Sequence, residues 1–483
     1  MRLRRDLRYI TDLNDKSKKA LFRDLSGIER TCRVRDFSRT GLSFLLEDGS
    51  LIFRIGDIIS DFRFYSFDDM VHSGSATIIH IQDECIDEKV ISRIGCSFDN
   101  LIDISSIIKV DKVTRLQNEY LDFIHSMAIE ENLNKEFVHL TSHLHFILSN
   151  FQNRLKEEEA KILEENNESF RQALTETLRT LTFESLNEVT NRFCENFTAI
   201  IGDFSDPKEH FIHRAFFQKR LNGFFMKSAL FFRAYTKPLG YAGDYEMMNI
   251  IYRNSFEGKD IFSQVMNKID CEGAASRAVR NRREYFYRKI RSLYEKTLDE
   301  NAMKIVSIAC GPCLEISDFI SQLNGSKSPC RIEIVAMDQD ANALADSRKR
   351  LDPIIDVLEG LSLQYVQGNI KALIVGKDNE KDPYRDADLI YTTGLFDYLS
   401  ANASNRLILE LYRYLKPGGT LIIGNFGMHN PQRFKMEYGS EWFLIHRSEE
   451  DLMDLTRGLP LDVSMNVEKE PEGINLFLNI SKP

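Results

Sequence analysis

KIVSIACGPCLE, at residues 304–315, is the stretch that decides the fold of the C-terminal part of this chain. It predicts a buried strand that breaks into a tight loop of small residues and continues into a helix. A second apolar run, residues 332–337, predicts a strand that ends on the carboxylate of Asp338. In an α/β sheet the small loop lets the backbone approach a ligand, and the acid can hold both hydroxyls of a ribose. The two runs together predict a nucleotide-type pocket.

Length and charge narrow the class of protein. At 483 residues the chain is long enough for two or three domains, each with its own core. The 63 basic and 73 acidic residues give a net charge of -10, which argues against nucleic acid as a partner. No run of about 18 uncharged apolar residues occurs, and the basic start at residues 1–5 lacks the apolar run of a signal peptide. We therefore expect a cytoplasmic protein without a transmembrane segment.

The eight cysteines are scattered, which predicts reduced thiols and not a disulfide framework. Two of them form the CxxC spacing Cys310-Gly-Pro-Cys313, which also occurs in redox pairs and in half-sites for zinc. No second CxxC and no HxxxH follows it in the chain. We therefore predict no metal, and we assign both thiols to the small side chains that a nucleotide loop needs.

Four segments are predicted along the chain. Short apolar runs separated by turn signals predict a small antiparallel β-barrel at the N-terminus. Residues 101–201 contain neither glycine nor proline and show helical spacing, which predicts a helical region; its acidic stretch at 157–168 is most simply a solvated helix face, with partner docking or homodimer formation as the alternative. The predicted segments are 1–110 for the barrel, 111–235 for a helical connector or dimerisation region, 236–300 for a substrate-capping and helical lead-in segment, and 301–483 for the α/β domain.

The C-terminal part shows seven candidate strands, the first five separated by helical patterns. Helices between consecutive strands favour parallel pairing, so we predict a Rossmann-like, mostly parallel seven-stranded sheet in a multidomain α/β protein. The candidate strands span residues 304–309, 332–337, 363–367, 387–392, 419–426, 461–467 and 474–480.

Three further motifs stand at the ends of these strands. QGNI at residues 367–370 closes the third strand, the fourth leads into Thr393 and Gly394, and KPGG at 416–419 precedes the fifth. Their order resembles that of class I S-adenosylmethionine (SAM)-dependent methyltransferases, over about residues 275–483. A dehydrogenase is the competing class of nucleotide-binding enzyme, and the Lys-Pro-Gly-Gly turn favours methyl transfer.

This resemblance implies a SAM site. The loop at 309–313 would pass beneath the methionine part of the cofactor, Asp338 would grip the ribose, and Asn369 and Ile370 would flank the adenine. The loop departs from the GxGxG pattern of the family, because glycine stands only at its centre and Ser307 replaces the acid usual just upstream. The implied cofactor-binding residues are Ala309, Cys310, Gly311, Pro312, Asp338, Gln339, Asn369, Ile370, Thr393 and Gly394.

Three stretches point to an acceptor. YTKPLGYAGDYEMM at 235–248, RNRREY at 280–285 and GLFDYL at 394–399 resemble the methyltransferases that make 3-hydroxypalmitate methyl ester for bacterial quorum sensing. The resemblance implies a small-molecule acceptor, a 3-hydroxy fatty acid or related acyl carboxylate. A guanidinium of the second stretch would orient that carboxylate, unless these arginines lie on a solvated helix face. The candidate catalytic or substrate-binding residues are Tyr241, Asp244, Arg280, Arg283, Asp397, Tyr398 and His429, with Arg282 and Asn425 beside them.

The phenylalanine-rich stretch at residues 211–232 has two interpretations. It is compatible with the wall of an acyl tunnel and with an ordinary helix core.

The N-terminal segment carries two motifs. RRDLR at residues 4–8 contains RxxxR, and DFSRTG at 36–41 contains DxSxxG, with IGCSF at 94–98 as a closing strand; residues 9–30 show no clear strand pattern. The pair resembles the PilZ domain, which binds cyclic di-GMP, whereas the alternative is a basic tail beside a small β-domain. The resemblance implies the cyclic di-GMP-binding residues Arg4, Arg5, Arg8, Asp36, Ser38 and Gly41.

We therefore predict a SAM-dependent methyltransferase, regulated by cyclic di-GMP, that O-methylates a 3-hydroxy fatty acid or related acyl carboxylate to a signalling methyl ester. Two alternatives stay open. One is a non-catalytic cyclic di-GMP-binding signalling adaptor, and the other is a methyltransferase that acts on a protein or another small molecule.

Overall fold

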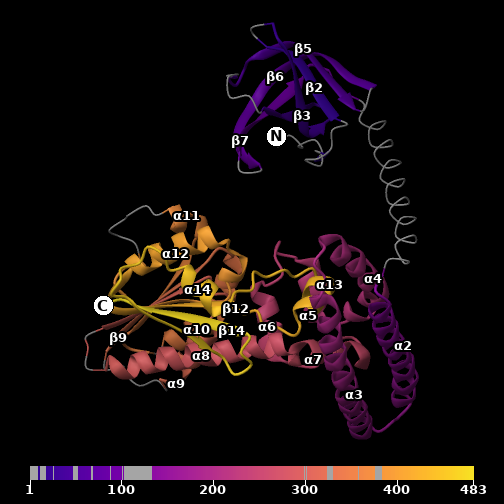
Figure 1. Ribbon diagram of the computed structural model, residues 1–483, viewed down its shortest axis with the longest axis vertical. Coiled ribbons are helices and arrows are strands. Elements are labelled where there is room, and N and C mark those ends of the chain that lie inside the picture. The colour runs from indigo at the N-terminus through magenta and orange to yellow at the C-terminus, as the bar shows by residue number, and fades with distance from the viewer. Residues whose placement is uncertain are drawn as a thin grey trace. The chain divides into compact units, whose positions relative to one another are not determined.

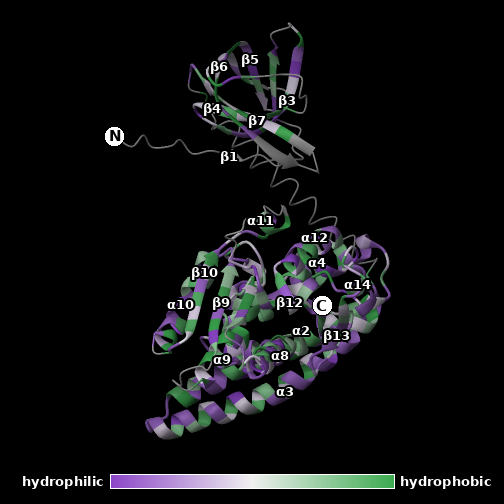
Figure 2. Ribbon diagram, turned by 90° about the vertical axis from the view of Figure 1, so that its left-hand side faces the viewer, coloured by the Kyte–Doolittle hydropathy of each residue, from purple (hydrophilic) through white to green (hydrophobic). Residues whose placement is uncertain are grey.

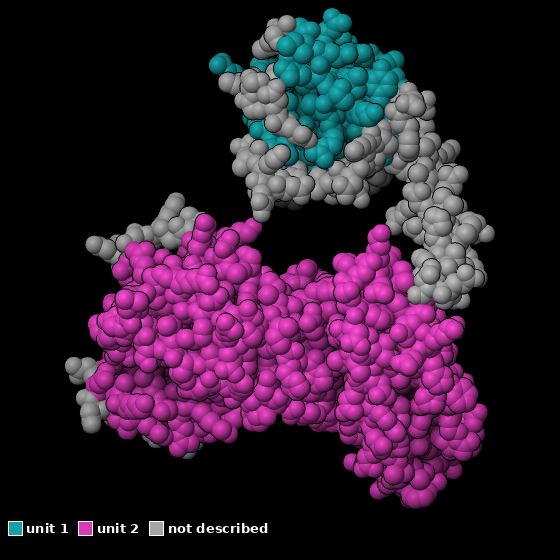
Figure 3. All heavy atoms as spheres, viewed as in Figure 1, with its two compact units in different colours: residues 1–130 teal, residues 131–483 magenta. Residues whose placement is uncertain are grey.

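The chain forms two compact units in the computed structural model, residues 1–130 and residues 131–483 (Figure 3). The structure describes residues 9–10, 18–24, 27–46, 53–66, 69–86, 89–100, 102, 133–298, 300, 302–323, 330–356, 358–375 and 383–483. Arg4, Arg5 and Arg8, and most of the predicted helix before residue 133, lie outside these ranges. The predicted boundaries after residues 110, 235 and 300 remain predictions.

The first unit contains a closed antiparallel β-barrel of six strands, as predicted. The strands pair in the order β3-β2-β5-β6-β7-β4, and β4 pairs with β3 to close the barrel. A short β1 lies beside the end of β3, where Tyr9 pairs with Phe37 and Ile10 with Asp36. The strands are β1 (Tyr9–Ile10), β2 (Lys18–Arg23), β3 (Glu29–Ser38), β4 (Gly41–Leu46), β5 (Ile58–Ser66), β6 (Asp69–Ile86) and β7 (Lys89–Phe98).

Two barrel strands, β2 and β5, are not evident in the sequence. β2 buries Lys18 together with Ala20 and Phe22 on alternate positions, and a buried lysine hides the alternation of apolar and polar residues. A bulge between Ile59 and Phe62 breaks the alternation in β5. The strand pattern in the sequence before residue 30 is therefore weak because β2 buries a lysine, Lys18, where an apolar residue is expected.

Helices begin the second unit, and α2, α3, α4, α5 and α7 pack around a phenylalanine-rich core. The helices are α2 (Lys135–Leu163), α3 (Glu168–Gly202), α4 (Pro207–Phe225), α5 (Ala229–Thr236), α6 (Tyr245–Arg253), α7 (Ile261–Glu272) and α8 (Ala274–Lys296). Asn167 caps α3 and so divides the predicted helical region into two helices. Phe216, Phe217, Phe225 and Phe231 are buried in the core, which confirms the helix-core interpretation of that stretch.

The helices differ in how their hydrophobic residues are distributed. Hydrophobic and hydrophilic residues alternate along α3 (Figure 2), and its buried residues lie between Thr182 and Ile201, in the second half of the helix. Within the described residues, no helix is both long and apolar enough to cross a membrane.

The rest of this unit is a seven-stranded sheet in the order β10-β9-β8-β11-β12-β14-β13. The five strands from β10 to β12 pair in parallel, and β14 runs antiparallel to both β12 and β13, which confirms the predicted, mostly parallel sheet. The elements are β8 (Ala302–Ile308), α9 (Leu314–Gln322), β9 (Arg331–Asp338), α10 (Ala341–Ile355), β10 (Leu361–Gln367), α11 (Ile370–Val375), β11 (Ala387–Thr392), η2 (Phe396–Tyr398), α12 (Ala401–Arg413), β12 (Leu415–Phe426), α13 (Arg433–Gly439), α14 (Glu449–Asp454), β13 (Ser464–Lys469) and β14 (Asn475–Ser481).

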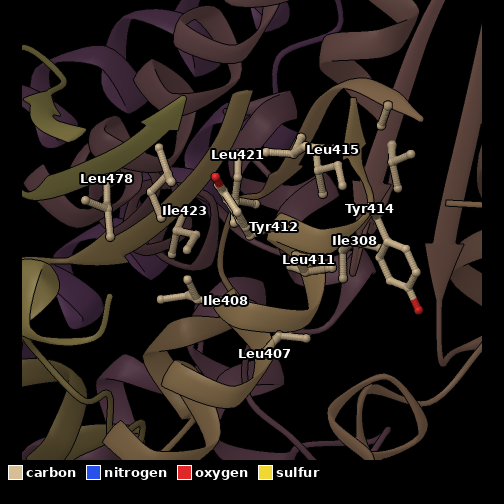
Figure 4. Packing of buried hydrophobic residues seen from close by; sticks show 14 of the residues in the cluster. Ile308, Leu407, Ile408, Leu411, Tyr412, Tyr414, Leu415, Leu421, Ile423 and Leu478 are labelled. Atoms are coloured by element: carbon tan, nitrogen blue, oxygen red, sulfur yellow. The ribbon is translucent and has the colours of Figure 1, made fainter. Parts of the chain in front are cut away.

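Helices cover both faces of this sheet (Figure 1). On one face α11, α12 and α14 pack onto the strands; Figure 4 shows Leu407, Ile408 and Leu411 of α12 in this core with Ile423 and Leu478 of the sheet. On the other face α8, α9 and α10 close a second core. Strands buried on both faces appear in a sequence as continuous apolar runs, which is why this part of the fold could be predicted.

Candidate active site

The strand order reverses between the two central strands, β8 and β11. In α/β sheets, ligands bind outside the carboxyl ends of the strands at such a point. The loop at 309–313 leaves β8 there, and Thr393 and Gly394 leave β11. The predicted cofactor-binding residues lie on these loops and just after β9 and β10, so the structure brings them to one edge of the sheet.

The loop after β8 has a tightly curved backbone. Ala309, Gly311 and Cys313 all have positive φ angles, of 53°, 54° and 50°. The left-handed conformation is costly for residues with a Cβ, so this loop needs small side chains. A Cβ placed at Gly311 would meet nothing within 4 Å, so there is open space above the loop for a ligand.

Asp338, at the end of β9, ties this loop to the next strand. Its Oδ2 accepts a hydrogen bond from Gly311 N at 2.9 Å, and its Oδ1 accepts one from Asp340 N at 2.9 Å. Burial raises the pKa of the carboxyl, and the two backbone N–H groups oppose that rise. Each oxygen keeps further acceptor capacity, which fits the ribose hydroxyls of a nucleoside.

Replacing Asp338 by alanine is expected to weaken the binding of S-adenosylhomocysteine about tenfold or more, because hydrogen bonds to a charged acceptor would be lost. Isothermal titration calorimetry measures the affinity. Asp340→Ala is the matched control, since the Asp340 carboxylate accepts Asn342 N at the start of α10. An Asp338 variant with wild-type affinity would remove the assignment to the ribose.

The predicted adenine side lies at the ends of β9 and β10. Gln339 is exposed, Ile370 is half-buried against the sheet core, and Asn369 accepts the N–H of Lys371 at 2.8 Å to start α11. These positions flank the same edge as Asp338, and their contacts with adenine remain predictions.

Two of the candidate arginines on α8 are bound to other parts of the protein. Arg280 donates to the carbonyl of Cys271 at 2.5 Å and pairs with Glu272 at 3.0 Å. Arg283 makes two hydrogen bonds of 2.6 Å to the carboxylate of Asp318. Both guanidinium groups therefore hold α8 against neighbouring helices.

Arg282 differs from both. It is 5% exposed, and its Nη1 donates to the carbonyl of Thr393 at 3.2 Å while its Nη2 lies 3.1 Å from Met248 Sδ. Among the described residues its Nε has no hydrogen-bond partner, and no ion pair forms. A Cβ at Gly394 would lie 3.0 Å from Nη1, so this glycine makes room for the guanidinium. The carboxyls of Asp397 and Glu315 lie near enough to interact with its charge, but neither forms an ion pair with it among the described residues. The site thus contains a buried guanidinium with an unsatisfied Nε, which an anionic ligand would help to stabilise.

The tyrosine- and glycine-rich segment before α6 lies at the same site. Burial raises the pKa of Tyr241, and the nearby carboxylates of Asp338 and Asp340 add to the rise, so this residue lies near the acid of the predicted ribose site. Tyr398 accepts a hydrogen bond from Trp442 Nε1 at 2.8 Å, and a Cβ at Gly243 would lie 2.6 Å from the Tyr398 hydroxyl. The segment therefore covers the edge of the sheet between the two loops.

Asp244 and Asn425, two further candidates, make their hydrogen bonds within the protein. Asp244 is fully buried, binds Arg233 Nε at 2.7 Å and caps α6. Asn425 is buried and accepts Arg447 Nη1 at 2.5 Å, whereas His429 is exposed after β12. The sequence did not predict Trp442 or Met248 as individual site residues. The one signal that distinguishes Trp442 is that it is the only tryptophan of the chain.

Asp397 is a buried carboxylic acid next to this site. Its Oδ1 accepts Phe426 N at 2.6 Å, and burial raises its pKa from 3.8 to about 6. The native state therefore holds this proton more tightly than the unfolded chain does. Ionisation of Asp397 destabilises the fold progressively as pH rises from about 4 to about 6.

We expect the free energy of unfolding of the wild type, relative to Asp397→Asn, to fall as pH rises through this window. Urea unfolding at a series of pH values, followed by the fluorescence of Trp442 in the second unit, measures the difference. The asparagine keeps the acceptor for Phe426 N but cannot ionise. A difference that does not change with pH would contradict the raised pKa.

Residues 307–423 match the protein family described as a methyltransferase domain. With the observed strand order, this match shows that the chain carries a class I SAM-dependent methyltransferase domain. No curated protein sequence matches the chain.

Three solved structures are distantly similar. The chain is 16% identical to a possible exported protein from Bordetella parapertussis, over 50% of this chain and 79% of that one, with a TM-score of 0.37. It is 15% identical to N-methyltransferase NodS from Bradyrhizobium japonicum WM9 in complex with S-adenosylhomocysteine, over 41% and 88%, with a TM-score of 0.27. It is 9% identical to magnesium protoporphyrin IX methyltransferase from Synechocystis PCC 6803 with bound S-adenosylhomocysteine, over 52% and 98%, with a TM-score of 0.35.

Proposed function

We propose that this protein methylates a carboxylate oxygen of a small acyl acid, such as a 3-hydroxy fatty acid, to give a signalling methyl ester. The observation that carries the proposal is Arg282, a buried guanidinium at the edge of the sheet that has an unsatisfied Nε and forms no ion pair among the described residues. A guanidinium presents forked donors that match a carboxylate, so an anionic acceptor would complete the site.

The residues at this edge fit SAM. The open space above Gly311 and the acceptor oxygens of Asp338 would take its methionine and ribose parts, and the cofactor supplies a methyl group bonded to a positively charged sulfur. An ionised carboxylate is already a nucleophile, so the protein needs little acid or base catalysis. Its main task is placement, which Arg282 performs while Tyr241 and Tyr398 shield the site from water.

The test incubates the full chain with methyl-labelled SAM and a lipid extract that contains 3-hydroxy fatty acids, and identifies the products by mass spectrometry. A labelled methyl ester is the expected product. Binding of S-adenosylhomocysteine without any labelled ester would favour a protein or other small-molecule acceptor. Absence of cofactor binding would favour the non-catalytic signalling adaptor.

We also propose that the barrel binds cyclic di-GMP and regulates the methyltransferase. Asp36 and Ser38 lie at the end of β3, and Gly41 begins β4. Tyr9, which directly follows Arg8 in the sequence, pairs with Phe37 between Asp36 and Ser38. This pairing supports a shared site for the two motifs, in which arginine faces stack on guanine and donors grip phosphate. Helices α2 and α3 would relay the signal or pair two copies of the chain.

Arg8→Ala and Asp36→Ala are expected to abolish cyclic di-GMP binding and to leave the affinity for S-adenosylhomocysteine unchanged. Calorimetric titration of each ligand measures both. Because Asp36 also forms an ion pair with Arg93, circular dichroism must confirm that its variant is folded. Lys19→Ala, at an exposed position of β2, is the control for loss of a basic side chain. Retained nucleotide binding by a folded Arg8 variant would remove this proposal.

A further inference from the structure

A small cavity lies between α5, α8 and α13, and α8 also carries Arg282 of the proposed acceptor site. Its volume is about 40 Å³, enough for one small polar group, since a water molecule needs roughly 10–15 Å³. Most of its wall is apolar and includes Leu230, Ala234, Ala275, Met436 and Trp442.

The polar lining of the cavity contains a buried ion pair, together with Ser276, Gln432 and Ser440. Lys435 Nζ lies 2.7 Å from Asp270 Oδ1, and the two residues are 5% and 6% exposed. Asp270 Oδ2 is buried and has no hydrogen-bond partner among the described residues. An unsatisfied buried oxygen is costly, so this atom requires a donor. Because Lys435 already balances the charge of Asp270, a neutral donor such as a hydroxyl fits better than a second cation.

An apolar cluster connects the cavity with Arg282. Leu230, Ala234 and Ala275 of the cavity wall belong to the same cluster as Met248, whose Sδ lies 3.1 Å from Arg282 Nη2. Trp442 packs against this cluster, lines the cavity and donates its N–H to Tyr398. These side chains are packed against one another, so an acyl chain anchored at Arg282 would reach the cavity by displacing some of them.

We propose that this cavity binds a hydroxyl group on the acyl chain of the acceptor, with Asp270 Oδ2 as the hydrogen-bond acceptor. The inference rests on the proposed function, because it takes the carboxylate of the acceptor to lie at Arg282. Ser276, which lines the cavity, precedes Arg282 by six residues on α8, which corresponds to about 9 Å along the helix axis. The recognised hydroxyl is therefore several bonds from the carboxylate and is not the one on carbon 3.

The probes are 10-hydroxydecanoic acid and decanoic acid, titrated into the full chain with bound S-adenosylhomocysteine. Calorimetry gives the affinities, and the fluorescence of Trp442, the only tryptophan, reports on the cavity directly. We expect the hydroxy acid to bind about tenfold more tightly than the plain acid and to shift the emission of Trp442. The comparison uses the wild type alone, so it does not depend on the folding of a variant.

Two variants of α5 test whether the cavity causes the preference for the hydroxy acid. Ala234→Leu fills the cavity and is expected to reduce the affinity for the hydroxy acid to that for decanoic acid, whereas Ala229→Leu, on the same helix but outside the cavity, should keep the preference. Equal affinity of the wild type for both acids would overturn the assignment of the cavity and leave the carboxylate acceptor in place. If neither acid binds, the acyl acceptor itself is overturned, and this inference with it.

Discussion

Replacing Arg282 by methionine is expected to lower kcat/KM for methylation of an acyl acid by about 100-fold or more. Truncating one member of a buried charge pair typically costs about 2–5 kcal/mol, and each 1.4 kcal/mol corresponds to about tenfold. The stability of the protein should not fall in parallel. Without a ligand the guanidinium is buried with an unsatisfied Nε and forms no ion pair among the described residues. This cost offsets its attraction to the carboxyls of Asp397 and Glu315, so the Met variant should unfold at a urea concentration no lower than the wild type. Steady-state kinetics and urea unfolding followed by Trp442 measure the two effects.

Three comparisons make this result specific. Arg288→Met, on the exposed side of the same helix, should leave kcat/KM unchanged, since Arg288 pairs with Glu284 at the surface. Arg282→Lys keeps the charge but not the fork, and should recover part of the activity. The affinities for S-adenosylhomocysteine and for 5′-methylthioadenosine, which lacks the amino-acid carboxylate, should both survive in the Met variant. Loss of the first with retention of the second would show that Arg282 binds the cofactor carboxylate and not the acceptor.

Replacing Gly41 by alanine is expected to destabilise the N-terminal barrel by about 3 kcal/mol or more. A Cβ at this position would lie 2.1 Å from the carbonyl oxygen of Cys96, which belongs to the backbone of β7 and cannot move without opening the β4–β7 pairing. Gly41 is therefore required by packing, whether or not the DxSxxG motif also contacts a nucleotide. Hydrogen exchange of peptides from β4 and β7 measures the effect within the full chain.

Gly74→Ala is the control for this prediction. It lies in β6 of the same barrel, and its added Cβ would meet only the ring of His72, at 3.5 Å, an ordinary contact. Exchange in β4 and β7 should stay slow in this variant and become fast in Gly41→Ala. Slow exchange in both variants would show that the barrel adjusts to the extra methyl group. The second unit, including its affinity for S-adenosylhomocysteine, should be unaffected in either case.

The α/β sheet and the position of the cofactor residues could be predicted from the sequence because both depend on local order. A strand buried on both faces must be apolar along its whole length, so β11 was predicted with its observed bounds, 387–392. The carboxyl ends of parallel strands meet at one edge, so the loop around Gly311 and the acid Asp338 had to lie together. Strands with interrupted alternation, such as β2 and β5, lack this signal and emerged only in the structure.

The tertiary structure alone decided which charged groups are available to a ligand. Arg280, Arg282 and Arg283 are almost equivalent in the sequence, but nearby residues of a helix point in different directions. In the folded chain Arg280 pairs with Glu272 and Arg283 pairs with Asp318. The pairing of Asp270 with Lys435, which are 165 residues apart, has no sequence signature. Thus the sequence by itself determined the class of sheet and the cofactor edge, because hydrophobic periodicity is a property of neighbouring residues. Charge compensation depends on partners from distant segments, and only the folded chain brings those together.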